Sequence, residues 1–161
     1  WCVGGRTGQL KALLDRYKFD SARQAGRVCA GLLDDSMPLL PRDVVVVPVP
    51  TAPAHRRVRG FDHTYVIARH FAKTRNLQLR SVLVRVDSGT QHFKNRAERL
   101  RTAENGLHIR GRVPDTVLLI DDIYTTGATM HACAQKLREN GVKQLFVAVV
   151  ARQVLDGTNH L

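Results

Sequence analysis

The sequence has 161 residues, with 25 lysines and arginines against 14 aspartates and glutamates and a formal net charge of +11. This length suits one domain with a buried core over residues 1–161, and no apolar stretch approaches the roughly 18–20 residues of a membrane span. The three cysteines lack metal-ligand spacing and no signal segment opens the chain, so we expect free thiols in a cytoplasmic protein.

The N-terminal stretch predicts two helices. The apolar side chains of the first helix, over residues 7–17, follow an amphipathic i, i+3, i+4, i+7 spacing: Leu10, Leu13, Leu14 and Tyr17. Ser21 can cap a second helix that runs to about residue 34, before two prolines interrupt the pattern. We therefore expect residues 1–41 to form a helical part that precedes an α/β core over residues 42–161.

The first strong strand is predicted at residues 43–49, with four consecutive valines at its centre. A rigid, proline-rich segment that contains Thr51 follows, and then a cluster of arginines: Arg56, Arg57 and Arg59. The planar guanidinium fork can bond two phosphate oxygens at once, so this segment suits a phosphate-bearing ligand. A basic surface turn without a ligand is the alternative interpretation.

A helix over residues 61–76 and a second strand over residues 80–86 come next, and the helix aromatics Phe61 and Tyr65 are interpreted as core. From residue 87 to residue 112 the apolar periodicity weakens. A connection of this length inside a compact domain is often a lid or a mobile loop. The candidate loop residues are polar or basic: Gln91, Lys94, Arg96 and Arg99.

The positive charge is concentrated in one part of the chain. Residues 55–112 carry 14 lysines and arginines against four acids, a balance of +10, whereas the remaining 11 basic and 10 acidic residues nearly cancel. Such a local field suits a polyanion, either the pyrophosphate of a small ligand or the backbone of a nucleic acid. A solvated basic face without a partner is the alternative.

Residues 117–120 form a short, continuous apolar run, which is typical of a strand buried on both faces of a parallel sheet. Asp121 and Asp122 follow at the carboxyl end of this strand. Ligands of open α/β sheets bind in the crevice outside those ends. The two adjacent carboxylates are therefore candidate site residues.

A turn of small residues comes next and opens a helix: Thr125, Thr126, Gly127, Ala128 and Thr129. The first N–H groups of a helix lack intrahelical partners and the helix dipole is positive there, so an anion is favoured. Gly127 lets the backbone approach a ligand, and the threonine hydroxyls add donors or cap the helix. The alternative is a threonine-capped helix with two solvated acids and no ligand.

The last predicted elements are a helix over residues 126–140, which Gly141 ends, and a strand over residues 145–151. Because helices separate the strands, right-handed crossovers would build a mostly parallel sheet. The sequence therefore predicts an α/β fold with a mostly parallel central sheet flanked by helices.

The segment from Val117 to Thr129 resembles the signature of type I phosphoribosyltransferases, the fold that binds 5-phosphoribosyl-1-pyrophosphate (PRPP). The resemblance implies that Asp121 and Asp122 are the catalytic acids, which hold the ribose hydroxyls directly or through Mg²⁺. It also implies that residues 125–129 take the 5′-phosphate, and that the N-terminal helices form a small hood over the base-binding side.

The same resemblance assigns two further segments. The loop after the first strand is where such enzymes hold pyrophosphate, and its candidate residues are Thr51, Arg56, Arg57 and Arg59. The polar stretch from residue 87 stands where they place a mobile loop that closes over the reaction centre, which here would carry Gln91, Lys94, Arg96 and Arg99.

A second group of residues resembles the ComF family of competence-associated, phosphoribosyltransferase-like proteins. These residues are the Val-Pro-Val-Pro strand end, the arginine cluster, the Arg59-Gly60-Phe61 segment and the helix segment from Leu13 to Phe19. Asp62 and His63 stand where that family usually has Asn and Gln, which leaves the role of these two positions open.

For an enzyme, the resemblance implies that a nitrogen nucleophile of an unknown acceptor base or amine displaces pyrophosphate from C1 of PRPP, with Mg²⁺ as the cofactor. Hypoxanthine and guanine enzymes of this fold place an Asp where Thr125 stands, as the group that handles the purine proton. A threonine cannot do so near neutral pH, so 6-oxopurine salvage is disfavoured.

Three functions remain open. Whether the chain forms a homodimer also remains open. The first function is an active phosphoribosyltransferase. The second is a non-catalytic PRPP-binding accessory protein that acts with competence proteins in DNA uptake, as membership of the ComF family would imply. The third is a PRPP-responsive regulator that binds nucleic acid, for which the basic stretch is the support.

Overall fold

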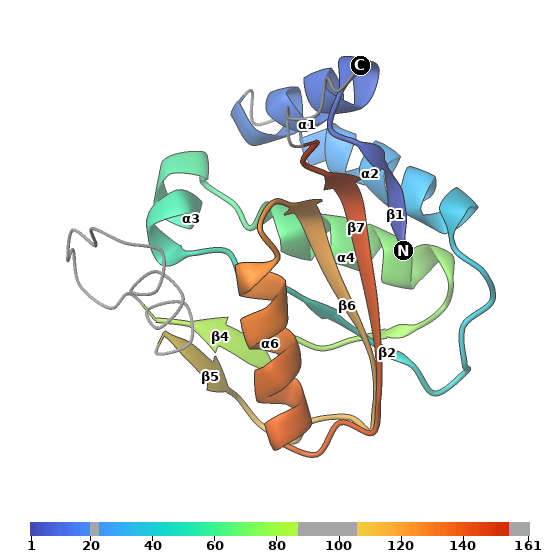
Figure 1. Cartoon of the computed structure of the whole chain (residues 1–161), viewed down its shortest axis with the longest axis vertical. Coiled ribbons are helices and arrows are strands. Elements are labelled where there is room, and N and C mark those ends of the chain that lie inside the picture. Colours follow the sequence, from blue (N-terminus) through green and yellow to red (C-terminus); the bar gives the residue numbers. More distant parts are fainter. Residues whose placement is uncertain (20–22, 87–105, 155–161) are drawn as a thin grey trace, which may run out of the picture.

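The computed structural model describes residues 1–19, 23–86 and 106–154 (Figure 1). Its main sheet has five parallel strands in the order β1-β7-β6-β2-β3. These strands are β1 (Cys2–Gly5), β2 (Val45–Pro48), β3 (Gln78–Leu79), β6 (Thr116–Tyr124) and β7 (Gln144–Arg152). A separate antiparallel pair is formed by β4 (Leu83–Arg85) and β5 (Leu107–Ile109).

Helices cover both faces of the main sheet. The described helices are α1 (Gly8–Phe19), α2 (Arg23–Ser36), α3 (Pro53–Arg59), α4 (His63–Thr74) and α6 (Ala128–Glu139), of which α3 stands apart from the sheet (Figure 1). In Figure 1, α6 lies in front of the sheet and α4 behind it. The predicted α/β fold, with a mostly parallel sheet flanked by helices, is confirmed. In the described part of the chain, no helix is long and apolar enough to cross a membrane.

The hydrophobic core is divided by the sheet into two clusters. One cluster joins α1, α2 and α4 to the sheet, and its largest fully buried side chains include Tyr17, Leu33 and Phe71. The other packs Cys133 and Leu137 of α6 against the opposite face. Strand β6 contributes to both clusters, because successive side chains of a strand point to opposite faces. Its central position explains why residues 117–120 are apolar without alternation.

Among the described residues, four elements were not predicted, and one predicted strand differs in extent and partner. The unpredicted elements are β1, β3, α3 and β5. The strand expected over residues 80–86 is present as the shorter β4, which pairs with β5 outside the main sheet, whereas β3 just before it pairs with β2 in the main sheet. The backbone changes partner within a few residues, and such short strands carry too few side chains to show a period.

The N-terminal part differs from the expected helical unit, because β1 is an edge strand that pairs with β7. Its Gly4 and Gly5 are poor strand formers, so only the pairing reveals the strand. Ser21, the expected helix cap, lies outside the described residues. The role of α1 and α2 as a hood that sets substrate choice stays a prediction.

Candidate functional site

The candidate site lies where β2 and β6 end. These two strands are parallel neighbours, with Pro48 opposite Ile120, so the loops that follow them leave from the same edge of the sheet. The loop after β2 leads into α3 and α4, and the loop after β6 leads into α6. The two segments predicted to hold pyrophosphate and 5′-phosphate are therefore brought together.

The two adjacent acids occupy different environments. The side chain of Asp122 is buried, and its Oδ2 lies 3.1 Å from Nε2 of His63, within ion-pair distance. Asp121 is half-buried and faces the loop that precedes α6. This divergence follows from the period of a strand, since both acids lie within β6. Asp121 thus lies at the loop before α6, whereas Asp122 is buried against His63.

A small cavity of about 40 Å³ separates Asp121 from the start of α6, and we call it the phosphate-loop hollow. Its lining is Asp121, Ile123, Tyr124, Thr125, Gly127, Ala128, Thr129 and Met130. This volume exceeds the minimum for one water-sized group, so the hollow suits a small polar group. Thr126 is exposed outside the lining and accepts a 3.4 Å hydrogen bond from the Ala128 N–H.

Gly127 shapes this hollow. Its φ of +77° is left-handed, and it stands at the N-cap of α6. A Cβ at this position would fall 2.5 Å from Cζ of Tyr124, so the close approach of the loop to the tyrosine ring also requires glycine. Both features were visible in the sequence only as a glycine between small residues.

A larger cavity of about 470 Å³, the arginine hollow, lies beside the loop after β2. This volume falls in the range of small-molecule sites, which is about 300–1,000 Å³. Its polar and charged lining is Thr51, Arg56, Asp62, Tyr65, Ser81, Arg85 and Arg110. Arg57 is exposed on α3 and is not part of the lining, and the side chain of Arg59 is not among those described.

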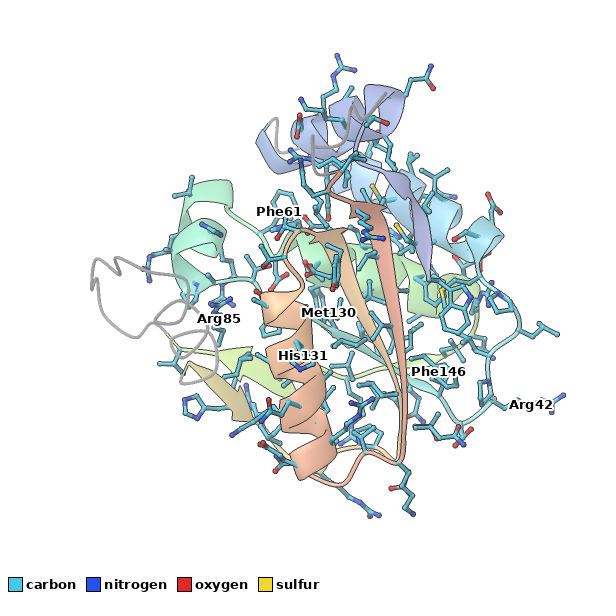
Figure 2. The ribbon with its side chains drawn as sticks, viewed as in Figure 1. Arg42, Phe61, Arg85, Met130, His131 and Phe146 are labelled. Atoms are coloured by element: carbon cyan, nitrogen blue, oxygen red, sulfur yellow. The ribbon has the colours of Figure 1, made fainter. Side chains whose placement is uncertain are left out.

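Two arginines of this hollow were missed by the sequence analysis. Arg85 ends β4 beside α3 (Figure 2), and Arg110 follows β5. The antiparallel pairing places Leu83 opposite Ile109 and Arg85 opposite Leu107, so Arg85 and Arg110 lie at opposite ends of this short strand pair, and both line the hollow although they are distant in the chain. The only signal was the excess of positive charge over residues 55–112.

The first turn of α4 links the two hollows. Asp62 caps the helix, and its Oδ1 accepts hydrogen bonds of 3.0 Å from the Tyr65 N–H and from Oγ1 of Thr51. Oγ1 of Thr64 donates a long hydrogen bond of 3.4 Å to Oδ1 of Asp121. The sequence left open the role of Asp62 and His63. These residues lie next to the predicted pyrophosphate segment and to the two acids of β6.

Buried groups behind the acids have raised pKa values. Burial, with a smaller effect of the Cys29 and Asp122 charges, raises the pKa of the Tyr17 hydroxyl far above its ordinary value, and this hydroxyl donates a 2.5 Å hydrogen bond to the His63 carbonyl. Burial, assisted by Asp122, raises the pKa of the Cys29 thiol to about 12. These groups are uncharged near neutral pH and act as packing and hydrogen-bonding groups.

The donor atoms fit Mg²⁺ shared with a ligand. Among residues 1–19, 23–86 and 106–154, no three His, Cys, Asp or Glu side chains gather as a metal cage. Mg²⁺ does not require one, because it keeps several waters and is commonly held by one or two carboxylates together with substrate phosphates. The half-buried carboxylate of Asp121 at the phosphate-loop hollow matches that requirement. The predicted loop residues Gln91, Lys94, Arg96 and Arg99 lie outside the described residues.

Solved structures establish the class of fold. The chain resembles UMP synthase of Leishmania donovani with a TM-score of 0.53 and 15% identity, over 89% of this chain and 30% of that protein. It resembles the glutamine PRPP amidotransferase of Bacillus subtilis with a TM-score of 0.50 and 20% identity, over 80% of this chain and 26% of that one. The fold is that of the type I phosphoribosyltransferases, as predicted.

The curated sequence relatives of the chain are named as competence proteins. The chain is 31% identical over 138 residues to competence protein ComFC of Streptococcus pneumoniae, covering 84% of this chain and 60% of the relative. It is 26% identical over 166 residues to competence protein F of Haemophilus influenzae, covering 93% of this chain and 71% of the relative. The chain is a homologue of these ComF-type competence proteins, and the resemblance to the ComF family is confirmed.

The chain also matches ComFC of Bacillus subtilis, with 31% identity over 99 residues. It spans 60% and 39% of the lengths of the two ComFC relatives. No family model matches the chain.

Proposed function

We propose that the chain binds PRPP at the carboxyl edge of β2 and β6. The phosphate-loop hollow would take the 5′-phosphate, Asp121 would meet the ribose, and the arginine hollow would take the pyrophosphate. The observation that carries this proposal is the placement of a small cavity at a helix start and an arginine-lined cavity at the ends of two neighbouring parallel strands. A PRPP molecule has the same order of groups, with a phosphate at one end and a pyrophosphate at the other.

The charges of the two hollows suit the reaction of PRPP with a nitrogen nucleophile. Loss of pyrophosphate from C1 develops positive charge on the ribose and negative charge on the leaving group. Asp121 faces the first charge, and Arg56, Arg85 and Arg110 face the second. When bound, Mg²⁺ would neutralise part of the pyrophosphate charge. The acceptor is an unknown nitrogen base or amine, and the whole chain would act as a Mg²⁺-dependent phosphoribosyltransferase.

A binding function without turnover is the second candidate. Its support is the similarity to proteins named for competence, and it would make the chain a PRPP-binding accessory protein in DNA uptake. The two candidates share the PRPP site and differ in the fate of the ligand. Release of pyrophosphate that depends on an added nitrogen acceptor favours the enzyme, and PRPP binding without such release across an acceptor screen favours the accessory role.

Direct binding of nucleic acid is a third candidate, supported by the net charge of +11. A DNA affinity that falls steeply with salt in the parent, and much less steeply in charge-reversed variants of Arg56 and Arg57, would favour it.

Calorimetric titration with PRPP, with and without Mg²⁺ at fixed ionic strength, tests the common site. Asp121→Asn preserves the shape of the side chain and removes its charge, so we expect the Mg²⁺-enhanced affinity to fall by at least about tenfold, equivalent to about 1.4 kcal/mol. Asp115→Asn is the matched control, since Asp115 lies at the amino end of β6, exposed and paired with Lys143. No binding by the parent, or an equal loss in both variants, contradicts the proposed site.

A further inference from the structure

Three consecutive residues at the start of α4 each contact a different part of the candidate site. Asp62 accepts the 3.0 Å hydrogen bond from Thr51, in the loop after β2. Nε2 of His63 lies 3.1 Å from Oδ2 of Asp122, and Oγ1 of Thr64 lies 3.4 Å from Oδ1 of Asp121. The pyrophosphate-side loop and both acids are thus connected through one turn of one helix.

Helical geometry makes this possible. Successive side chains of an α-helix are separated by about 100° around its axis, so neighbouring residues in one turn reach different partners. His63 and Thr64 are 4% and 2% exposed, which fixes both side chains within the protein. A movement of this turn would therefore displace the contacts to both acids together.

The first turn of α4 also contacts α1. The fully buried Tyr17 of α1 donates the 2.5 Å hydrogen bond to the His63 carbonyl, and its ring lies edge-on to the His63 ring with centroids 6.1 Å apart. This support arises from the N-terminal helices, so α1 contributes to the geometry of the acids without reaching the hollows.

We propose that His63 and Thr64 are positioning residues: they hold the carboxylates of Asp122 and Asp121, and Asp62 ties the same turn to the loop that carries Thr51. This assignment rests on the proposed PRPP function and deepens it. In this arrangement His63 places a ring nitrogen 3.1 Å from Oδ2 of Asp122. The turn is then a rigid support, and ligand contacts are made by other residues.

Paired substitutions separate positioning from packing. His63→Gln keeps an N–H donor, whereas His63→Leu removes it at similar size. Thr64→Ser keeps the hydroxyl, whereas Thr64→Val removes it with little change of shape. We expect His63→Leu and Thr64→Val to lower PRPP affinity by about tenfold each, as expected for loss of a polar contact to a charged group, and the Gln and Ser variants to stay within about threefold of the parent.

Unfolding temperatures without PRPP are measured in parallel. His70→Leu is the control, because His70 lies two turns further along α4, half-buried beside Arg27 and Gly31 of α2, and lines neither hollow. The assignment is supported if the loss of PRPP affinity correlates with removal of the donor group and not with a lower unfolding temperature. If the parent binds PRPP and His63→Leu and Thr64→Val bind it equally well, the positioning assignment is overturned and the proposed function stands. Absence of PRPP binding by the parent overturns the proposed function and this assignment with it.

Discussion

Substitution of Gly127 by alanine tests the geometry of the phosphate loop. Two separate effects oppose an alanine here. The φ of +77° is left-handed, which costs an L-residue about 1–2 kcal/mol. The added Cβ would also lie 2.5 Å from Cζ of Tyr124, an overlap that must be relieved by movement of the ring or the loop and costs about 1–3 kcal/mol more.

Gly111→Ala isolates the first effect, the left-handed strain. Gly111 has a nearly identical φ of +78°, and nothing lies within 4 Å of a Cβ placed on it. We therefore expect Gly111→Ala to lower the free energy of unfolding by about 1–2 kcal/mol, and Gly127→Ala to lower it by about 2–5 kcal/mol. Urea unfolding followed by circular dichroism measures both, and equal m-values would show that the folded and unfolded states are otherwise comparable.

A double substitution identifies the clash itself. Tyr124→Ala removes the ring that the new Cβ meets, so in the background of Tyr124→Ala the Gly127→Ala change should cost only the left-handed strain. The coupling energy of the cycle should be at least about 1 kcal/mol. Gly127→Ala should also weaken PRPP binding, because the hollow loses volume. Equal destabilisation by Gly127→Ala and Gly111→Ala, or a coupling energy near zero, would refute the close approach of the loop to Tyr124.

The remaining predictions concern packing and thiol chemistry. Gly26→Ala should destabilise the protein by about 1–2 kcal/mol, because its Cβ would lie 2.8 Å from Val66 and 2.9 Å from the buried hydroxyl of Tyr17. Gly31→Ala, in the same helix with nothing within 4 Å, should stabilise it by about 0.5–1 kcal/mol; thermal unfolding of both variants checks the sign. Burial raises the pKa values of Cys29 and Cys133 to about 12, so iodoacetamide at pH 8 should label one thiol in the native protein, the exposed Cys2, and three after unfolding. Mass spectrometry counts the labels, and labelling of all three thiols in the native protein would contradict the buried placement.

The two adjacent acids would not contribute equally to the proposed site. A strand turns successive side chains to opposite faces, so Asp121 reaches the phosphate-loop hollow while Asp122 is buried against His63. Asp122→Asn is therefore expected to lower both stability and PRPP affinity, whereas Asp121→Asn should affect chiefly the affinity. Thermal unfolding and calorimetry on the same samples distinguish the two patterns, and an unchanged stability of Asp122→Asn would contradict this division.

Local sequence determined the main parts of the fold. The apolar run before Asp121 specified a buried strand, because a strand at the centre of a parallel sheet has no solvent face. The small residues that surround Gly127 specified the loop and the helix start, since only glycine adopts the required φ without strain. The periodic apolar positions of α1, α4 and α6 specified helices that pack on a sheet. The resemblance to the ComF family and to type I phosphoribosyltransferases also rested on these local segments.

The tertiary structure determined which strands and side chains, distant in the chain, lie side by side. The strands β1, β3 and β5 exist because partners distant in the chain complete their hydrogen bonds, which no local period reveals. The same pairing of β4 with β5 brings Arg85 and Arg110 to the arginine hollow. Only the packing of α4 on β6 places His63 against Asp122 and Thr64 against Asp121. Contacts of this kind depend on relative positions of whole elements, whereas sequence patterns report the preferences of each element alone.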